Sequence, residues 1–207
     1  MSYFITFEGV EGVGKSTQCL LLAQNLQNTL KKNVVQTREP GGTELGEALR
    51  EVLLNPEVPS MTEMSELLLM FAARAEHLAR VIKPALASGN IVLCDRFTDA
   101  SFAYQGGGRG VDPKQIEKLE KLVQGSFTPD LTILLDMDVE TGLARAAARS
   151  DKDRFEKEKA QFFQRVRAAY LHRAEAEAKR FAIIDASKDV DNISSEIFQA
   201  VCEKFKW

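Results

Sequence analysis

Cysteine is scarce in this chain, and its positions follow no recognisable pattern. The three cysteines, Cys19, Cys94 and Cys202, are odd in number, lie far apart and have apolar neighbours, without the spacing of metal ligands. Disulfide frameworks and zinc sites need paired or closely spaced cysteines, so neither is expected. Widely separated, reduced thiols are typical of a cytoplasmic protein, and we expect that location.

Long apolar runs and a strong charge of either sign are also missing. No apolar stretch approaches the roughly 20 residues that span a bilayer. The N-terminus has no basic region followed by an apolar stretch. The 207 residues carry a formal net charge of −3, which gives no bulk attraction to nucleic acid or to an anionic membrane. We therefore expect neither of them as a partner, and any polyanion must be bound locally.

Short apolar strands alternate with helices along the whole chain. Strands are predicted at 3–7, 34–37, 91–94, 131–135 and 181–185. Helices are predicted at 17–30, 44–54, 62–87, 113–122, 139–149, 155–179 and 189–205, with a helix or tight loop at 97–104 and an irregular glycine run at 106–110. This order indicates an α/β fold in which a five-stranded parallel sheet carries helices on both faces. No linker or repeat indicates a second domain, so residues 1–207 are expected to form one.

The segment after the first predicted strand has the spacing of a phosphate-binding loop. Its residues are Gly9, Val10, Glu11, Gly12, Val13, Gly14, Lys15 and Ser16. In the pattern G-x-x-x-x-G-K-[ST], backbone N–H groups surround phosphate oxygens, the lysine reaches the outer phosphates and the hydroxyl can bind Mg²⁺. A plain glycine-rich turn is the alternative. Because a strand precedes the loop and a helix follows from Thr17, the context favours nucleotide binding.

Charged residues follow two further predicted strands, at the edge of the sheet where ligands bind. Arg38 and Arg96 can hold one phosphate from opposite sides, which implies a second phosphorylated ligand besides the one on the loop. Surface salt bridges with Glu39 or Asp95 are the alternative. The carboxylate of Asp95 is a candidate partner of Mg²⁺, or else a cap for the helix that begins near residue 97.

Phe71 and Arg74 lie three residues apart on a predicted helix. They can stack on a base and bond its edge, or they are a core aromatic residue and an arginine that extends to solvent. Their spacing alone favours the core interpretation.

A charged segment near 145–156 separates two predicted helices and carries Arg145, Arg149 and Arg154. A mobile segment with arginines suits phosphoryl transfer, in which negative charge spreads over the transferring group. A solvated connection between helices is the alternative. The phosphate loop favours a functional lid here.

Taken together, several segments resemble bacterial thymidylate kinase. They are Phe-Glu-Gly-Val-Glu-Gly-Val-Gly-Lys-Ser-Thr at 7–17, Thr-Arg-Glu-Pro-Gly-Gly-Thr at 37–43, Phe-Ala-Ala-Arg at 71–74, Asp-Arg-Phe at 95–97, 101–110 with its Tyr-Gln-Gly, and Pro-Asp-Leu-Thr at 129–132. The resemblance covers almost the whole chain. It implies a P-loop nucleoside monophosphate kinase fold, and transfer of the γ-phosphoryl group of ATP to dTMP with Mg²⁺, giving dTDP for dTTP biosynthesis. It also implies a homodimer, for which the apolar segment 64–78 is a candidate face.

The resemblance assigns roles to particular residues. It implies that ATP is held by residues 9–16 and Thr17, with Ser16 and Asp95 beside Mg²⁺. The residues it implies for dTMP are Glu11, Arg38, Phe71, Arg74, Arg96, Ser101, Tyr104 and Gln105. It thus overturns the core interpretation of Phe71. The catalytic residues it implies are Lys15, Arg96 and a lid arginine, with Arg149 the first choice and Arg154 the second, since Val13 stands where some members carry arginine.

Two other functions stay open at this point. A kinase for another pyrimidine monophosphate, such as dUMP or dCMP, would use nearly the same site. A nucleotide-switched regulatory ATPase would bind the nucleotide without transferring its phosphate to an acceptor. A GTPase switch is excluded, because the sequence contains no guanine-reading Asn-Lys-x-Asp.

Overall fold

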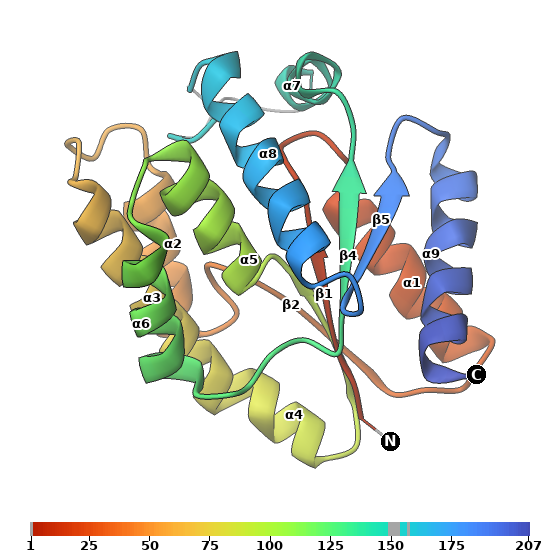
Figure 1. Ribbon diagram of the computed structural model, residues 1–207. Helices are drawn as coiled ribbons and strands as arrows, with labels where there is room; N and C mark the ends of the chain where they lie inside the picture. The colour runs from red at the N-terminus through yellow and green to blue at the C-terminus, as the bar shows by residue number, and fades with distance from the viewer. Residues whose placement is uncertain (1, 149–153, 157) are drawn as a thin grey trace.

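A parallel five-stranded sheet forms the centre of the molecule. Figure 1 shows it in the computed structural model, which describes residues 2–148, 154–156 and 158–207. The strands are β1 (Phe4–Glu8), β2 (Val34–Arg38), β3 (Ile91–Asp95), β4 (Leu131–Asp136) and β5 (Phe181–Asp185). Their order is β2-β3-β1-β4-β5, and all neighbours are parallel. The five predicted strands and the fold class are confirmed, with strand ends within one residue of the prediction.

Burial follows the position of each strand in the sheet. Every residue of the central strand β1 is buried, as are most of β3 and β4, whereas the edge strands β2 and β5 are largely half-exposed. Continuous apolar runs suit strands that are covered on both faces. Because all strands are parallel, Glu8, Arg38, Asp95 and Asp136 end at the same edge of the sheet, where a ligand site is expected.

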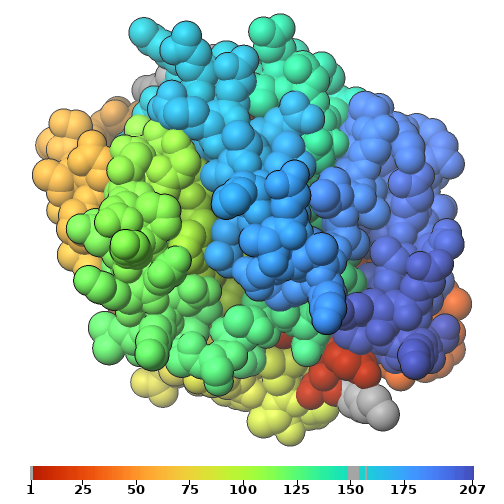
Figure 2. All heavy atoms as spheres, in the orientation of Figure 1, coloured from red at the N-terminus to blue at the C-terminus, as the bar shows by residue number. Residues whose placement is uncertain are grey.

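Helices cover both faces of the sheet. Their bounds are α1 (Lys15–Asn28), α2 (Glu44–Leu54), α3 (Glu63–His77), η1 (Leu78–Ile82), α4 (Lys83–Ala87), α5 (Thr98–Ser101), η2 (Phe102–Gly108), α6 (Pro113–Gln124), α7 (Val139–Ala147), α8 (Ala160–Ala176) and α9 (Val190–Phe205). In Figure 1, α8 passes in front of the sheet and α1 lies behind it, packed against α9. The space-filling view in Figure 2 shows α8, in lighter blue, lying between the green segments and the darker blue α9.

Two helix predictions need correction. The predicted helix 62–87 contains a π-helical turn, η1, between α3 and α4. The predicted helix 155–179 begins later, because residues 154–156 form a turn and α8 starts only at Ala160. Phe155 in that turn is 5% exposed, so its side chain packs inward rather than along a helix surface.

The glycine run at 106–110 was expected to be irregular, and that prediction is wrong for its first part. Gly106, Gly107 and Gly108 belong to the π-helix η2. A Cβ atom on Gly107 would lie 2.9 Å from the carbonyl oxygen of Arg165, and one on Gly108 would lie 2.5 Å from the ring of Phe162. Glycine therefore permits close packing of η2 against α8 rather than breaking the helix.

None of the helices in the described part of the chain combines the length and the apolar character that crossing a membrane requires.

Candidate active site

The phosphate loop connects β1 to α1 and is held tightly by the rest of the fold. Gly12 has φ = +76°, and a Cβ atom there would lie 1.8 Å from the carbonyl oxygen of Gly142 on α7. Val10 and Val13 are 3% and 1% exposed and pack into the core. Val10 and Val13 thus anchor the loop in the core, and Gly12 allows the backbone of α7 to approach it closely.

Lys15, the first residue of α1, is 8% exposed. Its ammonium group donates to the carbonyl oxygens of Gly9 and Val10, at 3.1 and 2.8 Å. Burial, followed by the nearby positive charge of Arg96, lowers the pKa of Lys15 to about 8. A negatively charged ligand at this place would therefore stabilise the charged form of Lys15.

Ser16 and Asp95 meet at the mouth of the loop. The hydroxyl of Ser16 donates to Oδ2 of Asp95 at 2.6 Å. The alternative role of Asp95 as a helix cap is excluded, because the N-cap of α5 is Phe97 and no side chain caps that helix. A hydroxyl and a carboxylate at one point are the hard oxygen ligands that Mg²⁺ prefers, so this pair fits the metal.

Arg96 follows β3 in a left-handed conformation, with φ = +71°. Its guanidinium donates from Nη2 to Oε1 of Glu11 at 2.7 Å and from Nη1 to the carbonyl oxygen of Gly9 at 3.0 Å. The same Nη1 lies 3.3 Å from the hydroxyl of Tyr170, and the guanidinium stacks over the ring of Tyr104. Three segments of the chain therefore fix this charge in one place.

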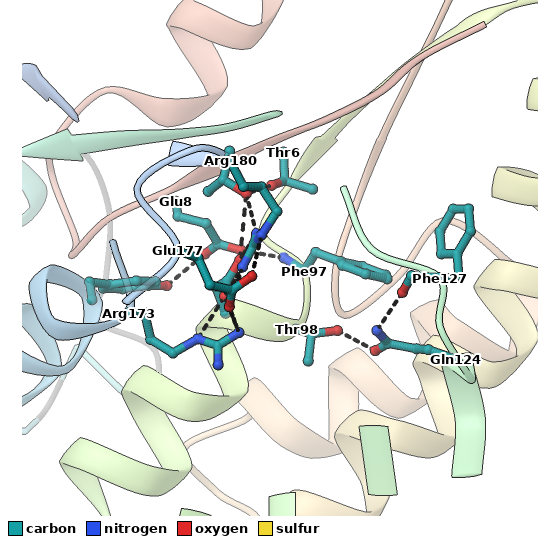
Figure 3. A network of polar contacts seen from close by, with 12 residues as sticks. Thr6, Glu8, Phe97, Thr98, Gln124, Phe127, Arg173, Glu177 and Arg180 are labelled. Carbon is teal, nitrogen blue, oxygen red and sulfur yellow. Dashed lines mark hydrogen bonds and ion pairs between the residues drawn. The ribbon is translucent and has the colours of Figure 1, made fainter. Parts of the chain in front are cut away.

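Glu8 supports the turn that carries Arg96. Its carboxylate accepts hydrogen bonds from the backbone N–H of Phe97 and from the hydroxyl of Tyr170, both at 2.7 Å, and Figure 3 shows the first of these within a larger polar network. Burial and the neighbouring Asp99 raise the pKa of Glu8 to about 8, against the opposing effects of Tyr170 and Arg96. Sequence reasoning gave Glu8 no role, because a buried carboxylate cannot be told from an exposed one in a motif.

Two cavities open beside the loop. The first, the loop cavity, is lined by Glu11, Gly12, Gly14, Lys15, Ser16, Arg38, Glu39, Arg50, Asp95 and Arg96. The second, the inner cavity, is lined by Glu11, Glu39, Pro40, Arg50, Leu54, Met70, Arg74, Arg96, Phe97, Ala100, Ser101, Tyr104, Gln105 and Phe155. Glu11, Glu39, Arg50 and Arg96 line both, so the two cavities adjoin at these four charged side chains.

The structure brings Arg38 and Arg96 to the same cavity, as the strand ends predicted. Arg38 is about half exposed and pairs with Glu47 of α2 at 2.9 Å, rather than with the acidic neighbours considered from the sequence. The bond from the backbone N–H of Gly42, ahead of that from Arg38, lowers the pKa of Glu47. Arg38 is thus held at the cavity mouth by a surface ion pair that a phosphate can replace.

Arg74 lies in the inner cavity and is 2% exposed, so it does not extend to solvent. Its Nε donates to Oε2 of Glu39 at 2.7 Å, and its Nη1 donates to the hydroxyl of Ser101 at 3.1 Å. Glu39 in turn contacts Nδ1 of His77 at 3.0 Å. The Nη2 of Arg74 donates to the carbonyl oxygen of Phe97 at 3.1 Å, so all three nitrogens have protein partners, and this rigid side chain loses little entropy when a ligand enters the cavity.

Phe71 lies beneath the inner cavity, and its role in stacking on the base stays a prediction. Phe71 is 2% exposed and packs in a core cluster with Leu67 and Phe102, beneath the guanidinium of Arg74 at 4.6 Å. Met70, one residue earlier, is the one of this pair found among the described residues that line the inner cavity. One residue along a helix turns a side chain by about 100°, so these neighbours face different directions.

Residues from α5 and η2 form the far wall of the inner cavity. Ser101, Tyr104 and Gln105 are all buried and all line it. The hydroxyl of Tyr104 donates to Oε1 of Glu11 at 3.0 Å, and the amide of Gln105 donates to Oε1 of Glu66 at 2.8 Å. The structure therefore brings together the three acceptor residues that the resemblance placed here.

The two predicted lid arginines have different outcomes. Arg149, the first choice, lies outside the described residues. Arg154 donates from Nη2 to Oε2 of Glu66 at 2.7 Å and from Nε to the carbonyl oxygen of Leu53 at 2.8 Å. As far as the described residues define the cavities, Arg154 lines neither of them, because a buried carboxylate holds it behind the wall. Its assignment as a catalytic arginine stays a prediction.

Sequence reasoning missed several residues of the site. They are Glu39, Arg50, Met70 and Phe155. Arg50 donates to the carbonyl oxygen of Pro40 at 2.9 Å. A usable signal existed for Arg50, because it stands one helical turn after Glu47 on the helix that follows the glycine-rich segment. No comparable pattern points to Phe155, because the sequence predicts a helix that begins at this residue.

Comparison with known proteins places the chain in a family. A family model described as thymidylate kinase matches residues 7–197. The thymidylate kinases of Pseudomonas putida (strain GB-1) and Pseudomonas entomophila (strain L48) are each 55% identical over 194 residues, covering 94% of this chain and 92% of theirs. A crystal structure of thymidylate kinase from Ehrlichia chaffeensis is 35% identical, with a TM-score of 0.80, and covers 97% of this chain and 98% of that one. The resemblance seen in the sequence is confirmed: the chain belongs to the thymidylate kinase family.

Proposed function

We propose that this protein transfers the γ-phosphoryl group of ATP to dTMP and releases dTDP. The observation that carries the proposal is the meeting of the loop cavity with the inner cavity at Arg96 and Glu11. A phosphate-binding loop alone describes any ATPase. A second, partly apolar cavity that adjoins it through an arginine provides a place for a phosphorylated acceptor.

The donor nucleotide is assigned to the loop cavity. Backbone N–H groups of the loop and the N-terminus of α1 attract its phosphates, and the ammonium group of Lys15 adds a positive charge. Ser16 and Asp95 are the residues that would hold Mg²⁺. When bound, the metal neutralises charge that develops on the phosphate oxygens.

The acceptor nucleotide is assigned to the inner cavity. Arg96 and Arg38 hold its phosphate at the boundary with the loop cavity, so the attacking oxygen is in line with the donor. Arg74 donates to the edge of the base, with Ser101 and Gln105 nearby, and Met70 contacts the face of the base. Tyr104 lies beside the sugar. A phosphate oxygen is already ionised at neutral pH, so the reaction needs positioning and charge rather than a strong general base.

A homodimer is also part of the proposal. Large apolar side chains stay exposed on α3 and on the neighbouring α6: Met64, Leu68 and Leu122. Burial of such side chains between two copies stabilises an isologous pair. Sedimentation as a dimer that Leu68→Glu converts to a monomer supports this face, and a parent chain that sediments as a monomer at micromolar concentration contradicts it.

One coupled assay tests the reaction. With ATP, Mg²⁺ and a panel of nucleoside monophosphates, dTMP is expected to give the highest kcat/KM. Some turnover of dUMP is expected as well, since one methyl group is worth only about 1 to 3 kcal/mol in a pocket. Faster turnover of dCMP than of dTMP would contradict the proposal. Hydrolysis of ATP that dTMP leaves unchanged would favour the regulatory ATPase instead.

A further inference from the structure

Glu66 is a buried carboxylate on α3 that contacts two other segments of the chain, η2 with its C-cap Arg109 and the turn 154–156. It is 1% exposed. Its Oε1 accepts a hydrogen bond from the amide of Gln105 in η2, at 2.8 Å, and its Oε2 accepts one from Nη2 of Arg154, at 2.7 Å. Arg109, just after η2, pairs with the same carboxylate at 3.3 Å. One negative charge therefore pairs with two guanidinium groups from separate parts of the sequence, and Glu158 supplies a second carboxylate to Arg109.

These two guanidinium groups lie on the ring of Phe155. The Cζ atom of Arg154 is 4.7 Å from the ring centroid, and that of Arg109 is 5.4 Å away. The ring makes an edge-on contact with Tyr104, at 5.7 Å between centroids. Phe155 and Tyr104 both line the inner cavity, whereas Glu66 does not reach it among the described lining residues. The carboxylate thus acts on the cavity through its partners.

The backbone around Arg154 is fixed at the same point. Its N–H donates to the carbonyl oxygen of Leu54 at 3.0 Å, and its Nε donates to that of Leu53 at 2.8 Å. Leu54 is another lining residue of the inner cavity. The turn 154–156 is therefore attached to the end of α2 by one backbone and one side-chain hydrogen bond, and to α3 by the ion pair. Phe155 lies in this turn.

The charge balance of this cluster makes Glu66 its critical member. Arg154 and Arg109 are 15% and 18% exposed, so each is mostly withdrawn from water. Arg109 also forms an ion pair with Glu158. Without Glu66, the charge of Arg154 would lose the carboxylate that it pairs with, and its side chain would gain by turning out to solvent. Phe155 would then lose this guanidinium contact, and with it part of what fixes its position in the cavity wall.

We propose that Glu66 is a positioning residue for the acceptor nucleotide: through Arg154, and together with Arg109, it holds Phe155 against Tyr104 and so completes this wall of the inner cavity. The inference rests on the proposed function, since it takes the inner cavity as the site of the nucleobase. Arg154 is then a structural support of that wall.

The experiment compares Glu66→Gln with a matched control on the same helix, Glu76→Gln, which makes the same chemical change in an exposed i,i+4 ion pair with Arg80. KM for dTMP, KM for ATP and kcat are measured for both, together with the rise in Tm caused by dTMP alone and by ATP alone. For Glu66→Gln we expect KM for dTMP to rise about tenfold, as on loss of one well-packed aromatic contact. KM for ATP and kcat stay within about twofold, and the Tm rise with dTMP shrinks while that with ATP is kept.

A purely structural role for Glu66 would lower the Tm of the free protein and leave KM for dTMP unchanged, which contradicts the inference. Equal losses in the dTMP and ATP responses would contradict it too. If Glu66→Gln does not fold, Arg154→Met breaks the same pair from its partly exposed side, and the same rise in KM for dTMP is expected. A parent protein that does not phosphorylate dTMP would overturn the proposed function and this inference together, whereas dTMP turnover with an unchanged KM in both variants overturns the inference alone.

Discussion

The guanidinium of Arg96 and the carboxylate of Glu11 form an ion pair of 2.7 Å at the boundary of the loop cavity and the inner cavity. Glu11 belongs to the phosphate loop, and Arg96 follows the neighbouring strand β3 in the sheet. The pair therefore joins the half of the site assigned to the donor to the half assigned to the acceptor. It also keeps Arg96 oriented, so that less order is lost when a phosphate arrives.

Replacement of Arg96 should act on the acceptor. We expect Arg96→Ala to lower kcat/KM for dTMP. The loss of transition-state stabilisation should be several kcal/mol, because each charge-assisted hydrogen bond to a phosphate is worth about 1.5 to 3 kcal/mol. The dissociation constant of ATP should change far less. Steady-state kinetics with each substrate varied in turn measures both, and Arg80→Ala, at an exposed position, is the control. Acceptor kinetics equal to those of the parent enzyme would show that Arg96 does not hold the phosphate.

Met70 and Phe71 should separate binding from stability. Met70→Ala is expected to raise KM for dTMP and to cost less than about 2 kcal/mol of unfolding free energy, because Met70 is only half-buried. Phe71→Ala should destabilise the fold by about 3 to 5 kcal/mol, the usual cost of removing a core aromatic ring. Urea unfolding and KM for dTMP are measured on both variants. The reverse pattern would return the base contact to Phe71.

The lowered pKa of Lys15 makes ATP binding depend on pH. With a pKa of about 8, the free enzyme loses this positive charge as the pH rises through 8, whereas bound phosphates favour the charged form and raise the pKa. ATP affinity should therefore fall by up to about tenfold per pH unit above 8, with uptake of a proton on binding. Titration calorimetry in buffers of different ionisation enthalpy detects that proton.

Glu8 also has a pKa near 8, so a control must separate the two groups. Lys15→Arg replaces the titrating ammonium by a guanidinium that keeps its charge, and the proton uptake should vanish. Uptake that persists in Lys15→Arg would assign the effect to Glu8 or another group. For folding, the sign is opposite: the depressed pKa of Lys15 costs stability below pH 8, and that cost is relieved as the pH rises from 8 toward 10.5.

Gly12 should tolerate no side chain. Gly12→Ala places a Cβ atom 1.8 Å from the carbonyl oxygen of Gly142, so either the loop or α7 must move, and we expect both lower stability and weaker ATP binding. Gly89→Ala is the matched control, since Gly89 has φ = +83° and open space around its Cα atom. It should cost only about 1 to 2 kcal/mol for the left-handed conformation, with normal ATP binding. Equal effects of the two changes on ATP affinity would show that the contact with Gly142 is unimportant.

The sequence predicted the sheet better than the site. Strand positions followed from apolar runs bounded by turns, because a strand buried on both faces needs apolar side chains at almost every position. The strand ends then located Arg38, Asp95 and Arg96 correctly beside the loop, since a parallel sheet collects its carboxyl ends at one edge. These steps rest on local patterns and on one general rule of topology.

Other parts of the site depend on contacts between distant segments. Met70 and Phe71 are equivalent in a spacing argument, and only the packing of α3 against η2 and α6 decides which of them faces the cavity. The charge of Arg154 is visible in the sequence, whereas its ion pair with Glu66, which lies 88 residues away, is not. The glycines of η2 predict a loop when the segment is read alone, because their close contact with α8 involves residues that are distant in the sequence.

The order of the strands has a consequence for the synthesis of the protein. β1 lies in the middle of the sheet, yet Phe4 pairs with Val92 and Ile5 pairs with Leu131. During translation, the strand that carries the phosphate loop leaves the ribosome before either of its neighbours has been made. Its apolar residues must wait unpaired until β3 and then β4 emerge, an interval in which such a segment is open to aggregation and to chaperones. The central position of β1 makes the loop rigid in the folded protein, but its pairing is completed only late in translation.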